Sequence, residues 1–330
     1  MFFSFYPVFS LLFSTIILGT IIRVSANRIF IIWIGLEINL ISFLPLILLN
    51  QHFYSSISAI KYFLTQSTAS IILLISFLTQ SLLPIRRIII LIAIIIKAGL
   101  PPYHFWFPSV IQSTNWFICL ILSTWQKLAP LTLIFFIYNK SKLFLTLILL
   151  SLFISSIGGI SQTKLRPLIA YSSIGHISWI LRVNIISITP AFLYLIFYLT
   201  IIITIFSLLR KITTSSLYKF FKLNTNIKSL IITAIIIFSL RGLPPFVGFF
   251  LKWIVLESVL KQRLLLAAFL ILSSIINLSY YLNLIFSIFF FQSSIKAYKH
   301  SPIFIPFFTI VTIISTPNIF IYAMIIFYKS

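Results

Sequence analysis

Four cations lie inside long apolar segments of the chain, namely Lys97, Lys127, Arg241 and Lys252. A charge at the centre of a bilayer costs about 2.5–3.5 kcal/mol even on a lenient scale, so it must face another charge, water or a cavity. Burial disfavours the ammonium form, so a buried lysine can exchange its proton near neutral pH, whereas arginine stays protonated. The lysines are therefore candidate proton relay groups. The alternative, strongest for Arg241, is a side chain that extends from a helix end to the membrane surface.

Glu37 is the only acidic residue within an apolar segment, and Glu257, the other acid of the chain, is interpreted as interfacial. Pairing of a buried carboxylate with a lysine favours the charged form of both groups. We expect Glu37 to pair with Lys97; the alternative is a pair that only fixes helix packing. Moving one charge against about 100 mV costs roughly 2.3 kcal/mol, so making or breaking one nearby ion pair is enough to drive proton transfer.

Two histidines are also placed where they could carry protons. His176 ends the polar stripe YSSIGH at residues 171–176, which could hold a chain of water, and His104 lies just after the proline pair at 101–102. Imidazole changes charge near neutral pH, so both are candidate relay groups, with a simple hydrogen-bonded side chain as the alternative. No carboxylates accompany them, and we expect no metal site.

The elements that must position these residues are membrane-spanning helices. The chain has 330 residues, of which 61% are hydrophobic and 8% charged, and apolar runs of about 18–25 residues recur along its length. We predict an all-α polytopic membrane protein in which even the first run is a retained helix, since no basic leader precedes it. Eleven spans are expected, at about 3–22, 28–49, 56–80, 87–107, 110–138, 142–160, 165–183, 188–210, 228–259, 264–291 and 303–327.

Nearly the same word interrupts the fourth and ninth spans, GLPPY at 99–103 and GLPPF at 242–246. Paired prolines lack N–H donors and clash with the preceding turn, so each helix should break near mid-membrane beside a cavity. The breaks lie five helices apart, which predicts two inverted five-helix repeats, 3–138 and 142–291, with the last helix outside them. The alternative is two simple proline kinks. The break residues are Gly99, Pro101, Pro102, Gly242, Pro244 and Pro245.

The distribution of charge and the number of cysteines exclude two further classes of function for this chain, nucleic-acid binding and redox chemistry. The net charge of +22 comes from cations scattered at the ends of apolar runs, which indicates interfacial anchors rather than binding of nucleic acid. The single cysteine, Cys119, cannot build a disulfide framework or an iron–sulfur cluster within this chain. Any redox chemistry must therefore belong to other proteins.

These motifs together resemble the antiporter-like membrane subunits of respiratory complex I. The resemblance implies that Glu37 and Lys97 form the coupling pair, that Lys127 is the central relay and Lys252 the distal lysine, and that His176 lies on the polar axis. It also implies an eleven-helix form that lacks three initial helices of larger members. Three residues depart from the family pattern: Arg241, Pro167 and Ser178. The words that carry the resemblance are WIGLEIN (33–39), KAGLPPYHFWFP (97–108), TWQKLAP (124–130), GGISQTKLR (158–166), AYSSIGH (170–176) and GLPPF (242–246) followed by Lys252 and Trp253.

The function that the resemblance implies is proton translocation in the mitochondrial inner membrane by a lateral relay of Glu37, Lys97, Lys127 and Lys252. NADH, FMN, iron–sulfur clusters and ubiquinone would be bound by other subunits, and no cofactor by this chain. Its partners would be other membrane subunits, including further antiporter-like ones, and membrane lipids such as cardiolipin. The alternatives are a free-standing cation/proton antiporter and a structural membrane subunit without its own proton path.

Overall fold

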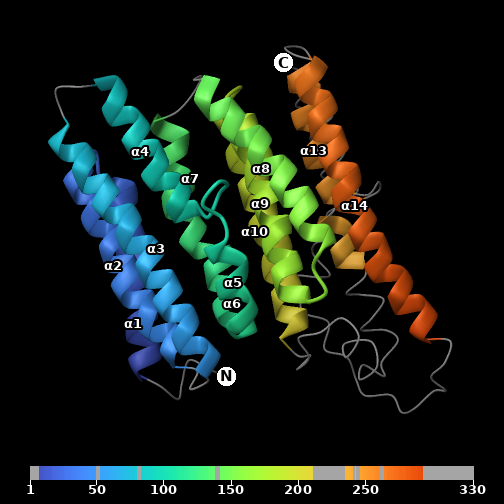
Figure 1. Ribbon diagram of the computed structural model, residues 1–330, viewed down its shortest axis with the longest axis horizontal. Helices are drawn as coiled ribbons and strands as arrows, with labels where there is room; N and C mark the ends of the chain where they lie inside the picture. Colours follow the sequence, from blue (N-terminus) through green and yellow to red (C-terminus); the bar gives the residue numbers. More distant parts are fainter. Residues whose placement is uncertain are drawn as a thin grey trace. The chain divides into compact units, whose positions relative to one another are not determined.

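The regular elements are helical throughout the part of the chain that the computed structural model describes, which is residues 7–49, 53–79, 83–137, 142–210, 235–240, 242, 246–260 and 264–292 (Figure 1). The predicted all-α class is therefore confirmed. The helices are α1 (Pro7–Ser25), α2 (Ile29–Leu48), α3 (Phe53–Leu78), α4 (Leu83–Ala98), α5 (Trp106–Ser113), α6 (Trp116–Ser123), α7 (Trp125–Ile137), α8 (Lys142–Ile160), α9 (Leu165–Asn184), α10 (Ile188–Leu209), α13 (Val247–Leu260) and α14 (Leu264–Gln292).

Seven segments among the described residues are long and apolar enough to cross a membrane as helices. Large apolar side chains also face outward, and the exposed fractions of Leu264, Leu265 and Phe105 are 77%, 78% and 73%. An apolar surface of this kind requires lipid rather than water around it. The protein is a multi-pass membrane protein. The count of eleven spans stays a prediction, because the span at 303–327 and the start of the span at 228–259 lie outside the described residues.

The chain forms two compact units, Met1–Asn139 and Lys140–Ser330. The boundary falls in the interval where the sequence prediction separates its two repeats, and α1 to α7 belong to the first unit while the remaining helices belong to the second. Whether the two units are related by inversion stays a prediction. Each unit is described below by itself.

In the first unit, α1 and α2 pack backbone to backbone. A Cβ atom added to Gly35 of α2 would lie 2.8 Å from the carbonyl oxygen of Gly19 in α1, so only hydrogen fits between the two helices there. Small residues allow this close approach in membranes, where packing rather than water exclusion joins helices. In turn, α2 packs on α3, α3 on α4, and α4 on α7. This arrangement brings side chains of α2, α3, α4 and α7 around one interior space.

The predicted continuous span at 110–138 is interrupted in the structure. The short helix α5 ends at Ser113, α6 ends at Ser123, and α7 begins at Trp125. The interruption at Thr124 has φ −110° and ψ −76°, and its side-chain oxygen donates to the carbonyl of Leu120 at 2.7 Å. A threonine hydroxyl that competes for the backbone carbonyl in this way is a common cause of a bend. Lys127 consequently lies in the first turn of α7.

The second unit is built around α9, nearly all of whose residues are buried. Neighbours of α9 are α8, α10 and α13, and α14 packs on α8. Across the α8–α9 seam the hydroxyl of Ser151 donates to Ser178 at 2.7 Å, and Ser178 donates to the carbonyl of Ile174 at 2.9 Å. Serine at 178, one of the three departures from the family pattern, is thus used in packing.

Replacing Ser178 with alanine is expected to lower the free energy of unfolding by about 0.6–1 kcal/mol, the usual strength of a hydrogen bond between membrane helices. The loss arises because Ser151 loses its interhelical acceptor and can then donate only to the carbonyl of Ile148, 2.8 Å away in its own helix. A double-mutant cycle with Ser151→Ala, measured by unfolding in bicelles, should give a coupling energy of about 0.6 kcal/mol. Strictly additive losses would show that the contact contributes nothing.

Candidate functional site

The first helix break is a glycine-capped helix end that fixes the position of Lys97. Gly99 has φ +68°, its N–H donates to Ile96, and the N–H of Leu100 donates to Ile95 at 3.1 Å. This pair of bonds is the Schellman motif, which satisfies the last carbonyls of a helix and requires a residue with positive φ. Lys97 is therefore held in the final turn of α4, two residues before the cap.

The chain after the break returns onto the helix end that it left. Pro101 and Pro102 carry it away from α4, and α5 then begins at Trp106, whose indole N–H donates to the carbonyl of Ile96 at 3.1 Å. The carbonyl of Ile96, which already accepts from Gly99, thereby gains a second donor, and this bond ties α5 to the end of α4. The break predicted at residues 99–102 is present in the structure.

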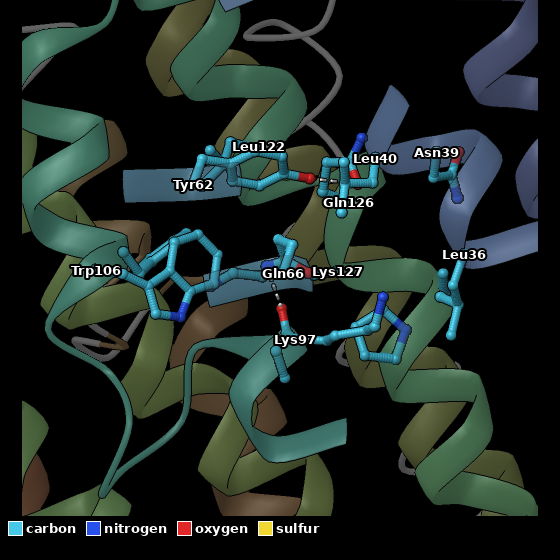
Figure 2. Close-up of a pocket in the computed structure, with 14 residues that line it drawn as sticks. Leu36, Asn39, Leu40, Tyr62, Gln66, Lys97, Trp106, Leu122, Gln126 and Lys127 are labelled. Carbon is cyan, nitrogen blue, oxygen red and sulfur yellow. Dashed lines mark hydrogen bonds between the residues drawn. The ribbon is translucent and has the colours of Figure 1, made fainter. Parts of the chain in front are cut away.

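Lys97 and Lys127 line the same buried cavity in the first unit (Figure 2). Their exposed fractions are 7% and 3%. Gln66 donates to the backbone carbonyl of Lys97 at 3.4 Å, and the hydroxyl of Tyr62 donates to Oε1 of Gln126 at 3.5 Å. The full lining consists of Leu36, Asn39, Leu40, Tyr62, Gln66, Lys97, Ala98, Trp106, Phe107, Leu122, Gln126, Lys127, Ala129 and Pro130.

The cavity has about the room of one water molecule. Its volume is about 20 Å³, and roughly 10–15 Å³ measured in this way holds one water. Both polar atoms of the Asn39 side chain, and Nε2 of Gln126, are buried without a hydrogen-bond partner among the described residues. A water placed here would find several polar partners.

The Lys127 ammonium is held against an aromatic face. Its Nζ atom lies 3.9 Å from the centroid of the Phe107 ring, which belongs to α5 and so reaches this position because of the helix break. Attraction between a cation and an aromatic ring is worth about 0.5–2 kcal/mol. This contact offsets part of the desolvation cost of the buried ammonium.

Glu37 lies near this cavity but does not line it. The carboxylate is partly buried on α2, one residue from Leu36, and its charge acts on Lys97 and on Tyr62. Within the described residues no ion pair joins Glu37 to Lys97 at 4.0 Å or less, so the expected contact pair is instead an electrostatic interaction over a longer distance. Its role in coupling stays a prediction.

Tyr62, Gln66 and Gln126 belong to the site although the sequence argument did not select them. Gln66 is buried in α3. The sequence feature that could have identified it is a lone glutamine within an apolar run. Gln126 stood inside a quoted motif but received no role. His104, which the sequence argument did select, is buried and does not line the cavity. Its Nδ1 atom lies 3.4 Å from the carbonyl oxygen of Pro102.

In the second unit, Lys252 and His176 lie on neighbouring helices. Lys252 is 8% exposed, and its Nζ lies 5.8 Å from the ring centroid of Trp179 in α9. His176, one turn earlier in α9, has Nδ1 3.1 Å from the hydroxyl of Tyr194. These contacts place polar groups of α9, α10 and α13 in one region of the unit, and the role of His176 on a polar axis stays a prediction.

The second break shares its glycine geometry with the first. Gly242 has φ +74°, and a Cβ atom added there would lie 2.7 Å from the carbonyl oxygen of Gly248. α13 begins at Val247 and carries Lys252 in its second turn. The other residues predicted for this break, Pro244 and Pro245, and the interior cation Arg241, lie outside the described residues.

Comparison with known proteins identifies the family. The model of the NADH:quinone oxidoreductase/Mrp antiporter transmembrane family matches residues 26–84 and 79–277. NADH-ubiquinone oxidoreductase chain 2 of Dasypus novemcinctus is 36% identical over 296 residues, which cover 85% of each chain. The chain belongs to the NADH-ubiquinone oxidoreductase chain 2 family. This confirms the resemblance that the six sequence motifs predicted.

A second member of the chain 2 family supports the family assignment, and a solved structure supports the fold. The chain 2 protein of Anopheles gambiae is 38% identical over 291 residues, covering 83% of this chain and 84% of its own length. A chain in the structure of respiratory complex I from Thermus thermophilus with bound aureothin has a TM-score of 0.76 and 19% identity, and the match covers 96% of this chain and 77% of that one. At this identity the likeness supports the fold.

Proposed function

We propose that this chain is a core membrane subunit of respiratory complex I in the mitochondrial inner membrane. It couples NADH oxidation and ubiquinone reduction, which occur on other subunits, to proton translocation through a lateral relay of Glu37, Lys97, Lys127 and Lys252. The observation that carries this proposal is the single buried cavity lined by both Lys97 and Lys127.

Proton exchange between Lys97 and Lys127 is supported by the small cavity that both residues line. This cavity has partly polar walls and room for about one water, and a water can accept a proton from one amine as it gives another to the next. Two ammonium groups on one small cavity repel each other, so protonation of one disfavours protonation of the other. A change of charge at either lysine is thereby transmitted to its neighbour.

Glu37 supplies the input to this pair. Two unit charges interact by an energy of roughly 332/(ε·r) kcal/mol, which reaches about 2 kcal/mol at a separation of about 8 Å and an effective dielectric constant of about 20, whatever the pair. That energy is comparable with the roughly 2.3 kcal/mol needed to move one charge against 100 mV. Movement or protonation of Glu37 can therefore change the charge state of Lys97 without direct contact.

Lys252 is the counterpart of these lysines in the second unit. Burial beside Trp179, with His176 one turn away along α9, gives it the same combination of cation, aromatic ring and polar neighbour. In the proposed relay it receives the charge signal from Lys127. The proposal assigns NADH, FMN, iron–sulfur clusters and ubiquinone to other subunits, and assigns further antiporter-like subunits as membrane partners.

Replacing Glu37 with glutamine tests the coupling role. The substitution keeps the shape of the side chain and removes the charge that acts on Lys97, so redox turnover should continue while fewer protons are translocated per electron. The measurement is the proton-to-electron ratio of the purified assembly reconstituted in liposomes.

The control for this experiment is Glu257→Gln, which neutralises the other acid of the chain, near the end of α13. It is expected to keep the wild-type ratio. An unchanged ratio in the Glu37 variant would favour a structural subunit without its own proton path. Stability and antiport activity of the isolated chain outside any large assembly would instead favour a free-standing antiporter.

A further inference from the structure

Three arginines of the first unit line a second, larger cavity. This cavity shares no lining residue with the cavity of Lys97 and Lys127. Arg23 comes from the last turn of α1, and Arg86 and Arg87 come from the first two turns of α4. Asn27, in the connection between α1 and α2, also lines it. The cavity has a volume of about 520 Å³. Its place at helix ends puts it at the depth of the membrane surface rather than the bilayer centre.

Arg23 is the unusual member of this group. It is 3% exposed, and its Nε and Nη1 atoms are buried without a hydrogen-bond partner among the described residues. Nε of Arg86 is in the same situation. A buried guanidinium with unsatisfied donors is costly, and such groups are retained where an anion completes them. The close α1–α2 contact at Gly35, whose added Cβ would lie 2.8 Å from Cβ of Arg23, holds the first arginine in this place.

The required anion must come from outside the chain. The sequence contains only two acidic residues, and neither Glu37 nor Glu257 lines this cavity. Among the described residues, none of the three arginines forms an ion pair within 4.0 Å. Phosphate oxygens suit this arrangement, because arginine binds them with two parallel hydrogen bonds and several arginines can share one phosphate.

The rest of the lining indicates what carries the phosphate. Apolar side chains form the remaining wall, among them Ile29 and Ile32 of α2, Ile90 of α4 and Leu133 of α7. A volume near 520 Å³ is within the roughly 300–1,000 Å³ of small-molecule sites, far more than one carboxylate side chain would fill. A lipid offers this combination of a phosphate with apolar chain beneath it, and basic pockets between membrane helices bind anionic headgroups.

We propose that the cavity formed by Arg23, Arg86 and Arg87 binds the phosphate headgroup of an anionic phospholipid. The bound lipid neutralises the buried arginine and fills the space between the ends of α1, α2 and α4. The site is separate from the proton relay, and nothing in the relay requires it.

Labelling of the purified assembly with a photoreactive phosphatidylglycerol in detergent–lipid micelles tests this proposal. In the wild-type protein, label should appear on residues 23–32 and 86–90. Each arginine is expected to contribute about fivefold to labelling, the equivalent of about 1 kcal/mol for a basic residue beside an anionic lipid. The Arg23→Gln/Arg86→Gln double variant should therefore lose about 25-fold, and Arg87→Gln alone about fivefold.

The matched control is Arg28→Gln, which removes an exposed arginine at the same end of the unit but outside the cavity lining. It should label like the wild type. Arg87 is exposed, so its variant gives a result even if the double variant fails to assemble. Loss of label in Arg28→Gln equal to that in Arg87→Gln, or its displacement by excess inorganic phosphate, would overturn the lipid assignment. Cross-linking of the site to a neighbouring polypeptide, or absence of label in the wild type, would overturn it too.

Discussion

Replacing Lys127 with methionine is expected to abolish the coupled proton pumping of this chain while leaving its assembly largely intact. Methionine fills a similar apolar space, and removal of a buried ammonium from beside Phe107 relieves a desolvation cost rather than creating one. The proton route is interrupted, because the cavity then has Lys97 as its only lysine. The proton-to-electron ratio of the reconstituted assembly should fall by the whole contribution of this chain.

Lys61→Met is the appropriate control for that experiment. Lys61 belongs to α3 in the same unit, is exposed, and does not line the cavity. The same chemical change there should leave the ratio unaltered. A normal ratio in the Lys127 variant, with full assembly, would refute the proposed relay.

Gly248→Ala is expected to produce the largest loss of stability among conservative substitutions in the second unit. The new Cβ would overlap the backbone carbonyl oxygen of Ser239 and lie 3.1 Å from the backbone nitrogen of Gly242. A backbone carbonyl cannot rotate away from the new methyl group as a side chain can. The α13 helix must therefore shift, and Lys252, one turn after Gly248, shifts with it. We expect a loss at the upper end of overpacking costs, about 3 kcal/mol, or roughly a hundredfold in the ratio of folded to unfolded protein.

A glycine-to-alanine substitution elsewhere in the second unit distinguishes the steric clash at Gly248 from the general effect of replacing a glycine in a helix. Gly175 lies in the middle of α9, and an added Cβ would lie 3.1 Å from the hydroxyl oxygen of Ser155, a side chain that can rotate. Gly175→Ala should therefore be nearly neutral, since alanine also favours the helix by about 1 kcal/mol. The amount of assembled complex and its thermal dissociation temperature measure both effects. Equal losses in the two variants would contradict the explanation from Ser239.

The sequence was most informative where a residue type conflicted with its surroundings. Lys97, Lys127 and Lys252 stood out because charge is costly in apolar segments, and all three are buried in the structure. The glycine–proline word at 99–102 predicted a broken helix because paired prolines cannot continue one, and α4 ends there. Arguments of this type need no knowledge of which helices are neighbours.

Properties that depend on packing between helices could not be predicted in this way. The cations other than the four interior ones were all interpreted as interfacial anchors, but Arg23 is 3% exposed and is enclosed by the protein instead of extending from its helix end. α1 continues past it to Ser25, and the close contact with α2 covers it. The relative position of Glu37 and Lys97 likewise depends on how α2, α3 and α4 pack together, which the periodicity of the sequence does not encode.

The small size of the lysine cavity has a consequence for energy conservation. A space for about one water cannot contain a continuous file of hydrogen-bonded waters, and such a file would let hydrogen ions flow back down the electrochemical gradient. In the proposed relay, one water lies between the two amines, so a proton passes only with a change of charge state at each lysine. Under that proposal the small cavity both permits proton transfer and limits proton leakage across the membrane.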